Sequence, residues 1–554
     1  MSAAIGLAMA GAIGFALTGC GSSGGGDAPP SAPEEPLGPA ISVQSVTILA
    51  TTDSATALSI TGTDDASGRN ASSPNGTSHQ TSFALGSQLP SDPGRTGRAL
   101  HLGFDLDDGD SPHHLDCIIN PPHDQVVDSD PVRFKARRHL VERSGLGASW
   151  DEIEAAMGVS HAEAVDALLA GLRQTHHQGA PYFLGEPILS WRERGRLSQQ
   201  ARDDLQDNIN DWSRDLRRWW HQEMLLTPSP LTERLVLFWH GVWTSSLSGT
   251  PYPHLMYVQN QTLRQWGTVN FAELARRLPK DPAMILYLDS DSNVKGRPNE
   301  NFARELLELF SLGEGQDYDE ADIPEIARCF TGYGLDDHFN YRFKTSDHDD
   351  GEKTVFGQTG HFTGDDVIEM VLAKRRCAEY ICEQLFDEFI SGPRDNTLIG
   401  DMTDLLHPSY DLVPVLRMLF TSNAFTNTAG YGTRMKSPVE LVIGTFRRVE
   451  LDWSYDDSPW TILWRTGSCD QDIFYPPNVR GWPRGTDWVD AKNFLTRRKQ
   501  AKHLGWYLEN RLPPHLADGL QDLLLSINPV GSIDTRSLKF HYRTLLLDPA
   551  YQVN

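Results

Sequence analysis

Apolar residues recur every three to four positions in many segments of the chain, a spacing that places them on one face of an α-helix. Few segments alternate with a period of two, and residues 340–344 do so best. The pattern predicts an all-α or mainly α fold, a multi-helical globular body with long irregular loops and few short strands. The predicted helices span residues 203–226, 230–243, 255–265, 270–277, 298–312, 319–329, 365–389, 411–419, 438–450 and 490–509.

The character of the sequence changes along the chain. A segment rich in Ser, Thr, Gly and Pro precedes the helical patterns, and residues 41–49 within it favour one short strand. We therefore expect five segments: a signal peptide at 1–20, a low-complexity linker at 21–95, a His/Asp-rich lead-in at 96–130, a helical body at 131–510 and a C-terminal helical extension at 511–554.

The first 20 residues form an apolar run that is too short to span a membrane comfortably and is typical of an export signal. Residues 17–20, "LTGC", resemble the bacterial lipobox, in which the cysteine becomes the lipid-bearing first residue of the mature protein. No Lys or Arg precedes the run, which departs from ordinary export signals. We expect a lipid anchor on Cys20 and a location in the cell envelope, periplasmic or surface-exposed.

Composition narrows the function classes. The formal net charge of −25, with no long run of basic residues, argues against binding to nucleic acid. After Cys20, five cysteines remain without CxxC spacing, so a structural zinc site is not expected. Cys377 and Cys382 favour buried apolar positions, and one or two disulfides elsewhere stay open. GxSxG, HExxH, P-loop and GxGxxG motifs are absent from the sequence.

Residues 298–312 carry more polar pattern than helix packing requires. Pro298 and Asn299 mark a helix start, and Gly313 stands where a C-cap belongs. Two interpretations of the polar side stay open: ordinary i,i+4 ion pairs on a solvated face, or a cleft shared with other polar residues. The helical wheel places Phe302, Ala303, Leu306, Leu307, Leu309 and Phe310 on one face, Asn301, Arg304, Glu305 and Glu308 on the other, and Glu300 at the border.

His240 lies in an apolar helix, "SPLTERLVLFWHGVW". Such a histidine is more often a satisfied core residue than a ligand or a general base, but both roles stay open.

The densest polar cluster is "KTSDHDDGEKTVFGQTGHFTGDD" at residues 344–366. Carboxylates and imidazole together are the ligands expected for a divalent metal ion. This interpretation makes His348 and Asp349 metal ligands or a base, and Lys353 an electrostatic clamp. The alternative is a solvated acidic loop. A second acidic and His-rich segment at 105–123 is a weaker metal candidate.

Residues 470–498 contain a Pro- and Gly-rich loop with Trp482 and Trp488. Such aromatic loops can stack on sugars, but more often they plug the end of a helical core. Asn478 and Arg480 are the polar residues of interest in this loop.

Several blocks together resemble one exported bacterial family, the domain of unknown function 1800 family. They include "LVLFWHGVWTSS", "NENFARELLELFSLG", "HDDGEKTVFG", "KSPVELVIG" and "FYPPNVRGWPRGTDW", in the family's order. The resemblance implies a mainly helical exported protein without an established activity. It also implies a partner, because family members are often encoded beside a second exported family, domain of unknown function 1501, which is similar to alkaline phosphatases. The sequence departs from the family where Gly241 and Val242 follow His240.

Two function hypotheses follow. The first is metal-assisted hydrolysis, or a related reaction, on an envelope or extracellular polymer. The second is a non-catalytic envelope assembly or binding protein that works with a second exported protein. For the first, the candidate catalytic residues are His240, Asn299, Glu300, Arg304, Glu305 and Lys353, and the candidate metal ligands are His348 and Asp349.

Overall fold

The computed structural model describes residues 42–49, 56–63, 81–85, 131–449 and 459–554. The chain divides into two compact units, Met1–Pro122 and His123–Asn554.

The first unit contains an antiparallel sheet of three strands in the order β1-β2-β3. The strands are β1 (Ser42–Leu49), β2 (Thr56–Thr63) and β3 (Thr81–Leu85). Val46 pairs with Ile60 and Leu58 pairs with Phe83 across the sheet. The first strand lies where the sequence predicts one, and two further strands lie within the segment for which we expected a linker. The predicted signal peptide, Cys20 and the candidate segment 105–123 lie outside the described residues.

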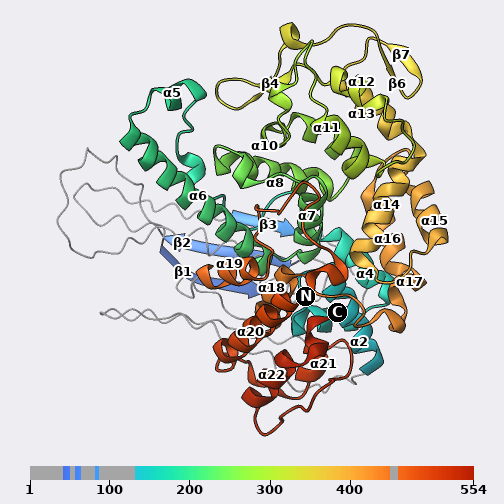
Figure 1. The fold of residues 1–554 in the computed structure, drawn as a ribbon. Helices are drawn as coiled ribbons and strands as arrows, with labels where there is room; N and C mark the ends of the chain where they lie inside the picture. Colours follow the sequence, from blue (N-terminus) through green and yellow to red (C-terminus); the bar gives the residue numbers. More distant parts are fainter. Residues whose placement is uncertain (1–41, 50–55, 64–80, 86–130, 450–458) are drawn as a thin grey trace, which may run out of the picture. The chain divides into compact units, whose positions relative to one another are not determined.

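The second unit is built mainly of helices, which confirms the predicted fold class (Figure 1). The strands in its described residues form two antiparallel pairs, β4 (Tyr333–Leu335) with β5 (Tyr341–Phe343), and β6 (Lys353–Val355) with β7 (Gln358–Gly360). The helices are α2 (Pro131–Ser144), α3 (Trp150–Met157), α4 (His161–Ala170), α5 (Trp191–Arg196), α6 (Gln199–Leu226), α7 (Pro230–Val242), α8 (Pro253–Gly267), α9 (Phe271–Arg277), α10 (Pro282–Tyr287), α11 (Asn301–Glu305), α12 (Asp322–Cys329), α13 (Gly364–Ala373), α14 (Arg375–Phe389), α15 (Asn396–Leu406), α16 (Leu412–Thr421), α17 (Asn423–Thr426), α18 (Pro438–Arg448), α19 (Pro459–Ser468), α20 (Ala491–Leu508), α21 (Leu520–Leu524) and α22 (Leu538–Leu547).

A π-helical segment, η5 (Leu306–Ser311), continues α11. The remaining one-turn segments are 3-10 helices, namely η1 (Tyr182–Gly185), η2 (Leu247–Gly249), η3 (Leu278–Lys280), η4 (Ser290–Ser292), η6 (Thr345–Asp347), η7 (Thr428–Gly430), η8 (Gly485–Trp488), η9 (Pro514–Ala517) and η10 (Pro549–Gln552).

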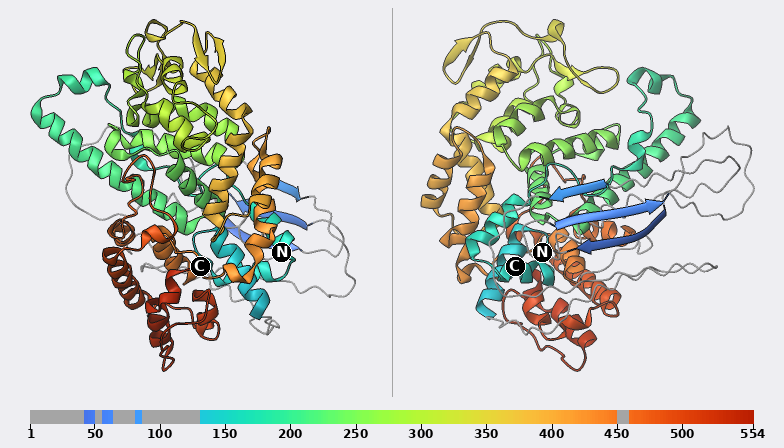
Figure 2. Two further views of the ribbon diagram at one scale, coloured as in Figure 1. Left: turned by 45° about the vertical axis from the view of Figure 1, so that its right-hand side comes forward. Right: turned by 180° about the vertical axis from the view of Figure 1, so that it is seen from behind.

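Helix α7 occupies the middle of this unit. It packs against α8, α6 and α2, and twelve of its thirteen residues are buried. The β4–β5 and β6–β7 pairs lie at one end of the unit with α11 to α13, and α20 to α22 lie at the opposite end in all three views (Figures 1 and 2). Seven of the eight candidate residues therefore lie in or beside elements at one end of the unit, and the eighth, His240, lies on α7 in the core.

The buried carboxylate of Glu142 pairs with a group of buried basic side chains. Glu142 of α2 is in ion pairs with Arg448, with Lys436 and with Arg138. Burial by itself raises the pKa of Glu142, but the three cations outweigh that effect and lower it to about 2. Since its partners come from α2 and from the region of α18, the cluster joins segments about 300 residues apart in sequence.

The described cysteines Cys329, Cys377, Cys382 and Cys469 are all free and buried. This confirms the prediction for Cys377 and Cys382, and burial raises the pKa of each of these two thiols to about 12. None of the helices that the structure describes is sufficiently long and apolar to cross a membrane.

Lys436 makes stability depend on pH. Burial, together with Arg448, lowers its pKa from about 10.5 to about 7. Between these values the unfolded chain binds a proton that the folded chain does not, so the free energy of unfolding should rise with pH, by at most about 1.4 kcal/mol per pH unit. Urea unfolding at pH 7, 8 and 9 should show this rise, and Lys436→Met should flatten it. Exposed Lys499→Met is the control, and equal slopes in the two variants would contradict the assignment.

Candidate functional site

His240 lies in an aromatic part of the core. Its ring centroid is 5.3 Å from those of Phe474 and Trp482 and 5.6 Å from that of Trp220. The side chain is 1% exposed, and burial lowers its pKa to about 3, so the imidazole is neutral at physiological pH. Its Nε2 has no hydrogen-bond partner among the described residues. No hydrogen bond, ion pair or ring contact within these residues joins His240 to the other seven candidates.

The polar side of α11 and η5 carries the ion pairs that the i,i+4 spacing predicts. Arg304 lies 3.5 Å from Glu300 and 3.2 Å from Glu308, and a further carboxylate, Glu320, lies 2.7 Å away. Arg304 is about one-third exposed and Glu300 about half. Exposed pairs of this kind contribute about 0–1 kcal/mol each. Arg304 therefore has three carboxylate partners close to it on the protein surface.

The apolar face of the same helix is confirmed as well. Phe302, Leu306 and Phe310 are buried, and Gly313 ends the helix in a left-handed conformation (φ +91°) with its N–H donating to the Leu307 carbonyl oxygen.

Asn299 and Glu305 flank these ion pairs in different surroundings. The Asn299 backbone N–H donates to the Asn293 side chain, and its own amide donates to the Asp289 carbonyl oxygen, so it fixes the loop before α11. Glu305 is half-buried, and burial followed by repulsion from Glu308 raises its pKa.

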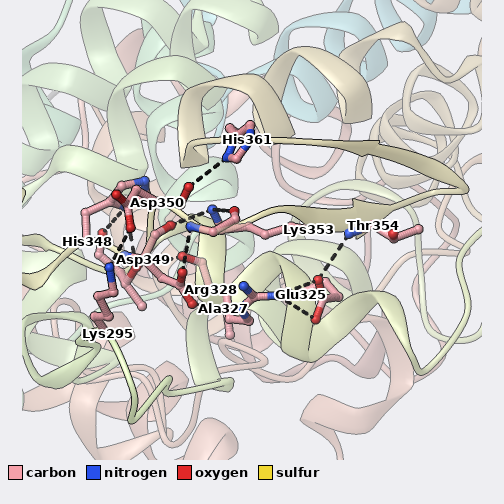
Figure 3. A network of polar contacts seen from close by, with 12 residues as sticks. Lys295, Glu325, Ala327, Arg328, His348, Asp349, Asp350, Lys353, Thr354 and His361 are labelled. Carbon is pink, nitrogen blue, oxygen red and sulfur yellow. Dashed lines mark hydrogen bonds and ion pairs between the residues drawn. The ribbon is translucent and has the colours of Figure 1, made fainter.

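The loop at 345–353 is held together by its own backbone (Figure 3). Lys353 is 1% exposed, and its Nζ donates to the carbonyl oxygens of Asp349 and Gly351. Asp349 accepts a hydrogen bond from Arg328, which is the main cause that lowers its pKa to about 2. His348 donates from Nδ1 to the Thr331 carbonyl oxygen at 2.9 Å. The side chains that we predicted to bind a metal therefore connect the loop to α12 and to the turn that follows it.

No group of three or more His, Cys, Asp or Glu side chains in the part of the chain that the structure describes is arranged to hold a metal ion. The prediction that His348 and Asp349 bind a metal gains no support from this geometry.

Sequence reasoning missed a cleft of about 410 Å³ beside α7. The end of α14, the start of α18 and the loop that leads into η8 form its other walls. None of the eight candidate residues lines it. We name it the arginine–tryptophan cleft, and its main lining residues are Arg234, Phe238, Gly241, Asp387, Glu388, Arg434, Glu440, Trp482, Arg484 and Trp488.

Two arginines and two glutamates form a charge-balanced group in the wall of this cleft. Arg234 lies 2.7 Å from Glu388 and 2.5 Å from Glu440. Arg434 lies 2.6 Å from Glu440 and 3.7 Å from Glu388. Burial alone raises the pKa of Glu440, but the two guanidinium groups outweigh it and hold the pKa well below its ordinary value. Glu440 therefore stays ionised at physiological pH.

Hydrogen-bonding capacity remains unused in the same wall. Arg234 Nη2 and Trp482 Nε1 are buried and have no hydrogen-bond partner among the described residues. Leaving such a donor unsatisfied costs about 1–3 kcal/mol. A ligand that brings acceptor oxygens would recover this cost.

The Trp-bearing loop is fixed to α7 by direct backbone contact. Gly481 adopts a left-handed conformation (φ +77°), and a Cβ there would lie 2.3 Å from the Gly241 carbonyl oxygen. Only glycine fits without distortion. Trp482 and Trp488 are buried, as expected of a loop that plugs the core, yet both also line the cleft.

Residues 139–546 match the family model described as protein of unknown function (DUF1800). The chain belongs to this family. No curated protein and no solved structure matches it. All eight candidate residues, and all residues that line the cleft, fall within the part of this DUF1800 protein that matches the family model.

For the loop at 345–353, we expect Lys353→Met to lower the free energy of unfolding by about 2–4 kcal/mol, because two carbonyl oxygens lose a charged donor. Lys295→Met, which removes an exposed pair with Asp350 of the same loop, should cost under about 1 kcal/mol. Urea unfolding measures both. Elemental analysis of the wild type and His348→Ala is the companion test. Near-stoichiometric metal that is lost in the variant would show that this loop is a metal site after all.

The contact between Gly481 and Gly241 can be tested with a matched pair of glycines. Gly485 is also left-handed (φ +55°), but a Cβ there would meet nothing within 4 Å. Gly485→Ala should cost about 1–2 kcal/mol of stability from backbone strain alone. Gly481→Ala should cost more, because the strain and the overlap with α7 add. If the two variants lose the same free energy of unfolding in thermal or urea unfolding, the loop does not contact α7 as closely as described.

Proposed function

We propose that this DUF1800 protein is an exported binding protein of the cell envelope, and that the arginine–tryptophan cleft holds a neutral, hydroxyl-rich ligand such as part of a polysaccharide. One observation carries the proposal. The wall of the cleft combines neutralised Arg–Glu pairs, two buried donors without partners and two tryptophan rings.

The volume and the charge of the cleft support a small neutral ligand. About 410 Å³ lies within the usual range for sites that bind small molecules. Because Arg234 and Arg434 neutralise Glu388 and Glu440, the wall does not favour a ligand of either charge. Hydroxyl groups both donate and accept hydrogen bonds, so one ligand can satisfy Arg234 Nη2 and Trp482 Nε1 and also donate to Glu388.

The chemistry of the cleft favours binding over catalysis. A general acid must carry a proton at the working pH, and Glu440 does not. Metal-assisted hydrolysis, the other hypothesis, has no support from the described residues, because the candidate metal ligands pair with Arg328 and the Thr331 carbonyl oxygen. We therefore favour the non-catalytic alternative.

The location and the partner belong to the same proposal. Attachment to a bacterial membrane through Cys20 is supported by the lipobox-like residues 17–20, and a phosphatase-like partner of the domain of unknown function 1501 family is supported by the family resemblance. The acidic chain, at −25, disfavours nucleic acid as the ligand.

The test is a binding titration with soluble neutral oligosaccharides, namely gluco- and chito-oligosaccharides, measured by calorimetry. Gly241 lines the cleft and a Cβ there would meet nothing within 4 Å, so Gly241→Leu should place its side chain in the cleft and abolish binding. Trp482→Phe keeps an aromatic ring but removes the indole donor and part of the ring area, and it should weaken binding about tenfold.

Gly400→Leu is the matched control, since Gly400 is also inside a helix, α15, with open space at its Cβ. Equal binding by Gly241→Leu and Gly400→Leu would show that the ligand sits elsewhere. Release of shorter sugars from the probes would instead support a hydrolase.

A further inference from the structure

A basic face with exposed apolar side chains lies on α20 and the start of α22. These helices lie at the end of the unit opposite the β4–β7 loops (Figures 1 and 2). We name it the basic–aromatic face. It consists of Leu495, Arg498, Lys499, Lys502 and Trp506 of α20 and Phe540 of α22.

The spacing along α20 places these residues on one side of the helix. Positions 495, 498, 499, 502 and 506 follow one another at steps of three to four residues, apart from the adjacent pair 498 and 499, and all are exposed. The opposite side, with Arg497, Ala501, Leu504 and Leu508, is buried. Helix α20 is therefore anchored through one side and presents the other to its surroundings.

Apolar side chains are exposed at both ends of this stripe. Leu495 is 66% exposed, Trp506 is 55% and Phe540 is 42%. Arg543 of α22 lies 5.5 Å from the Trp506 ring centroid and 5.7 Å from that of Phe540. Since α20 packs on α22, the two rings are held as neighbours. Single exposed apolar residues are ordinary, but an aromatic pair beside a basic stripe forms an amphipathic surface.

The charges of this face are not neutralised within the described residues. Neighbouring basic residues have acidic partners: Lys492 pairs with Asp470, and Arg536 pairs with Asp534. Arg498, Lys499 and Lys502 form no ion pair with any acidic side chain that the structure describes. In a chain with 74 acidic and 49 basic residues, three adjacent uncompensated cations favour an anionic partner.

We propose that the basic–aromatic face binds the surface of a membrane that contains anionic phospholipid. Lysine and arginine reach the headgroups while their stems and the apolar tips enter the interface, where Trp and Phe are favoured. Each basic side chain near such a surface strengthens binding about fivefold. The proposal does not depend on the ligand of the cleft or on the lipid anchor.

The experiment measures co-sedimentation of the full chain, carrying Cys20→Ser, with lipid vesicles. One vesicle type contains zwitterionic lipid alone, and the other also contains about 30% anionic phospholipid, which gives the vesicle a negative surface potential. The readout is the affinity for anionic vesicles divided by the affinity for zwitterionic vesicles. The apolar N-terminal run contributes equally to both affinities, so its effect cancels in this ratio. The triple variant Arg498→Gln, Lys499→Gln, Lys502→Gln should lower that ratio roughly 100-fold. Trp506→Ser should weaken binding to both vesicle types.

The matched control removes three exposed basic side chains elsewhere, Arg192→Gln, Arg375→Gln and Arg480→Gln, which changes the net charge equally. The control should bind as the parent does. An equal loss in both triple variants, or no preference of the parent for anionic vesicles, would overturn the proposal. The proposal would also be overturned if the triple variant of α20 lost binding to vesicles and to soluble polyglutamate equally while Trp506→Ser had no effect. The face would then bind acidic polymers rather than a membrane.

Discussion

Buried ion pairing between distant segments is the constraint on which the second unit depends. Glu142 is fully buried among Arg138, Lys436 and Arg448, and Glu440 is fully buried between Arg234 and Arg434. Removing one partner of such a pair costs about 3–5 kcal/mol, because the other charge is left in the interior. Helices α2, α7 and α18 must therefore come together in a single arrangement. The wall of the arginine–tryptophan cleft is one product of that requirement.

Helix α7 contributes residues both to the aromatic core and to the cleft that we assign to ligand binding. His240 packs against aromatic rings in the core, while Arg234 and Gly241 line the cleft. Trp243, next after the helix, stacks on Phe310 of η5 at 4.5 Å. The family blocks "LVLFWHGVWTSS" and "NENFARELLELFSLG", which contain Trp243 and Phe310, are thus neighbours in space. Their polar residues nevertheless make separate contacts: His240 packs in the core, and Arg304 forms ion pairs on the surface.

Features set by near neighbours in sequence were predictable, and features set by distant ones were not. The i,i+4 pairs of Arg304 and the apolar face of α11 follow from spacing alone. Nine of the ten predicted helices appear with shifted ends, while the tenth, at 365–389, is divided at Lys374 into α13 and α14. Arg234 meets Glu388 across 154 residues, which no local pattern indicates. Similarly, the negative net charge concealed the basic stripe of α20, because an average over the chain says nothing about one helix face.

The close approach of Gly481 to Gly241 determines how the cleft can work. Because backbone rests directly on backbone, the tryptophan loop cannot move closer to α7 than it already lies. A ligand entering the cleft would meet walls that are already in their bound arrangement, so little conformational entropy would be lost on association. Recognition in this protein would then follow a lock-and-key course, with discrimination set by shape and residence time set by how fast the ligand leaves rather than by closure of a lid.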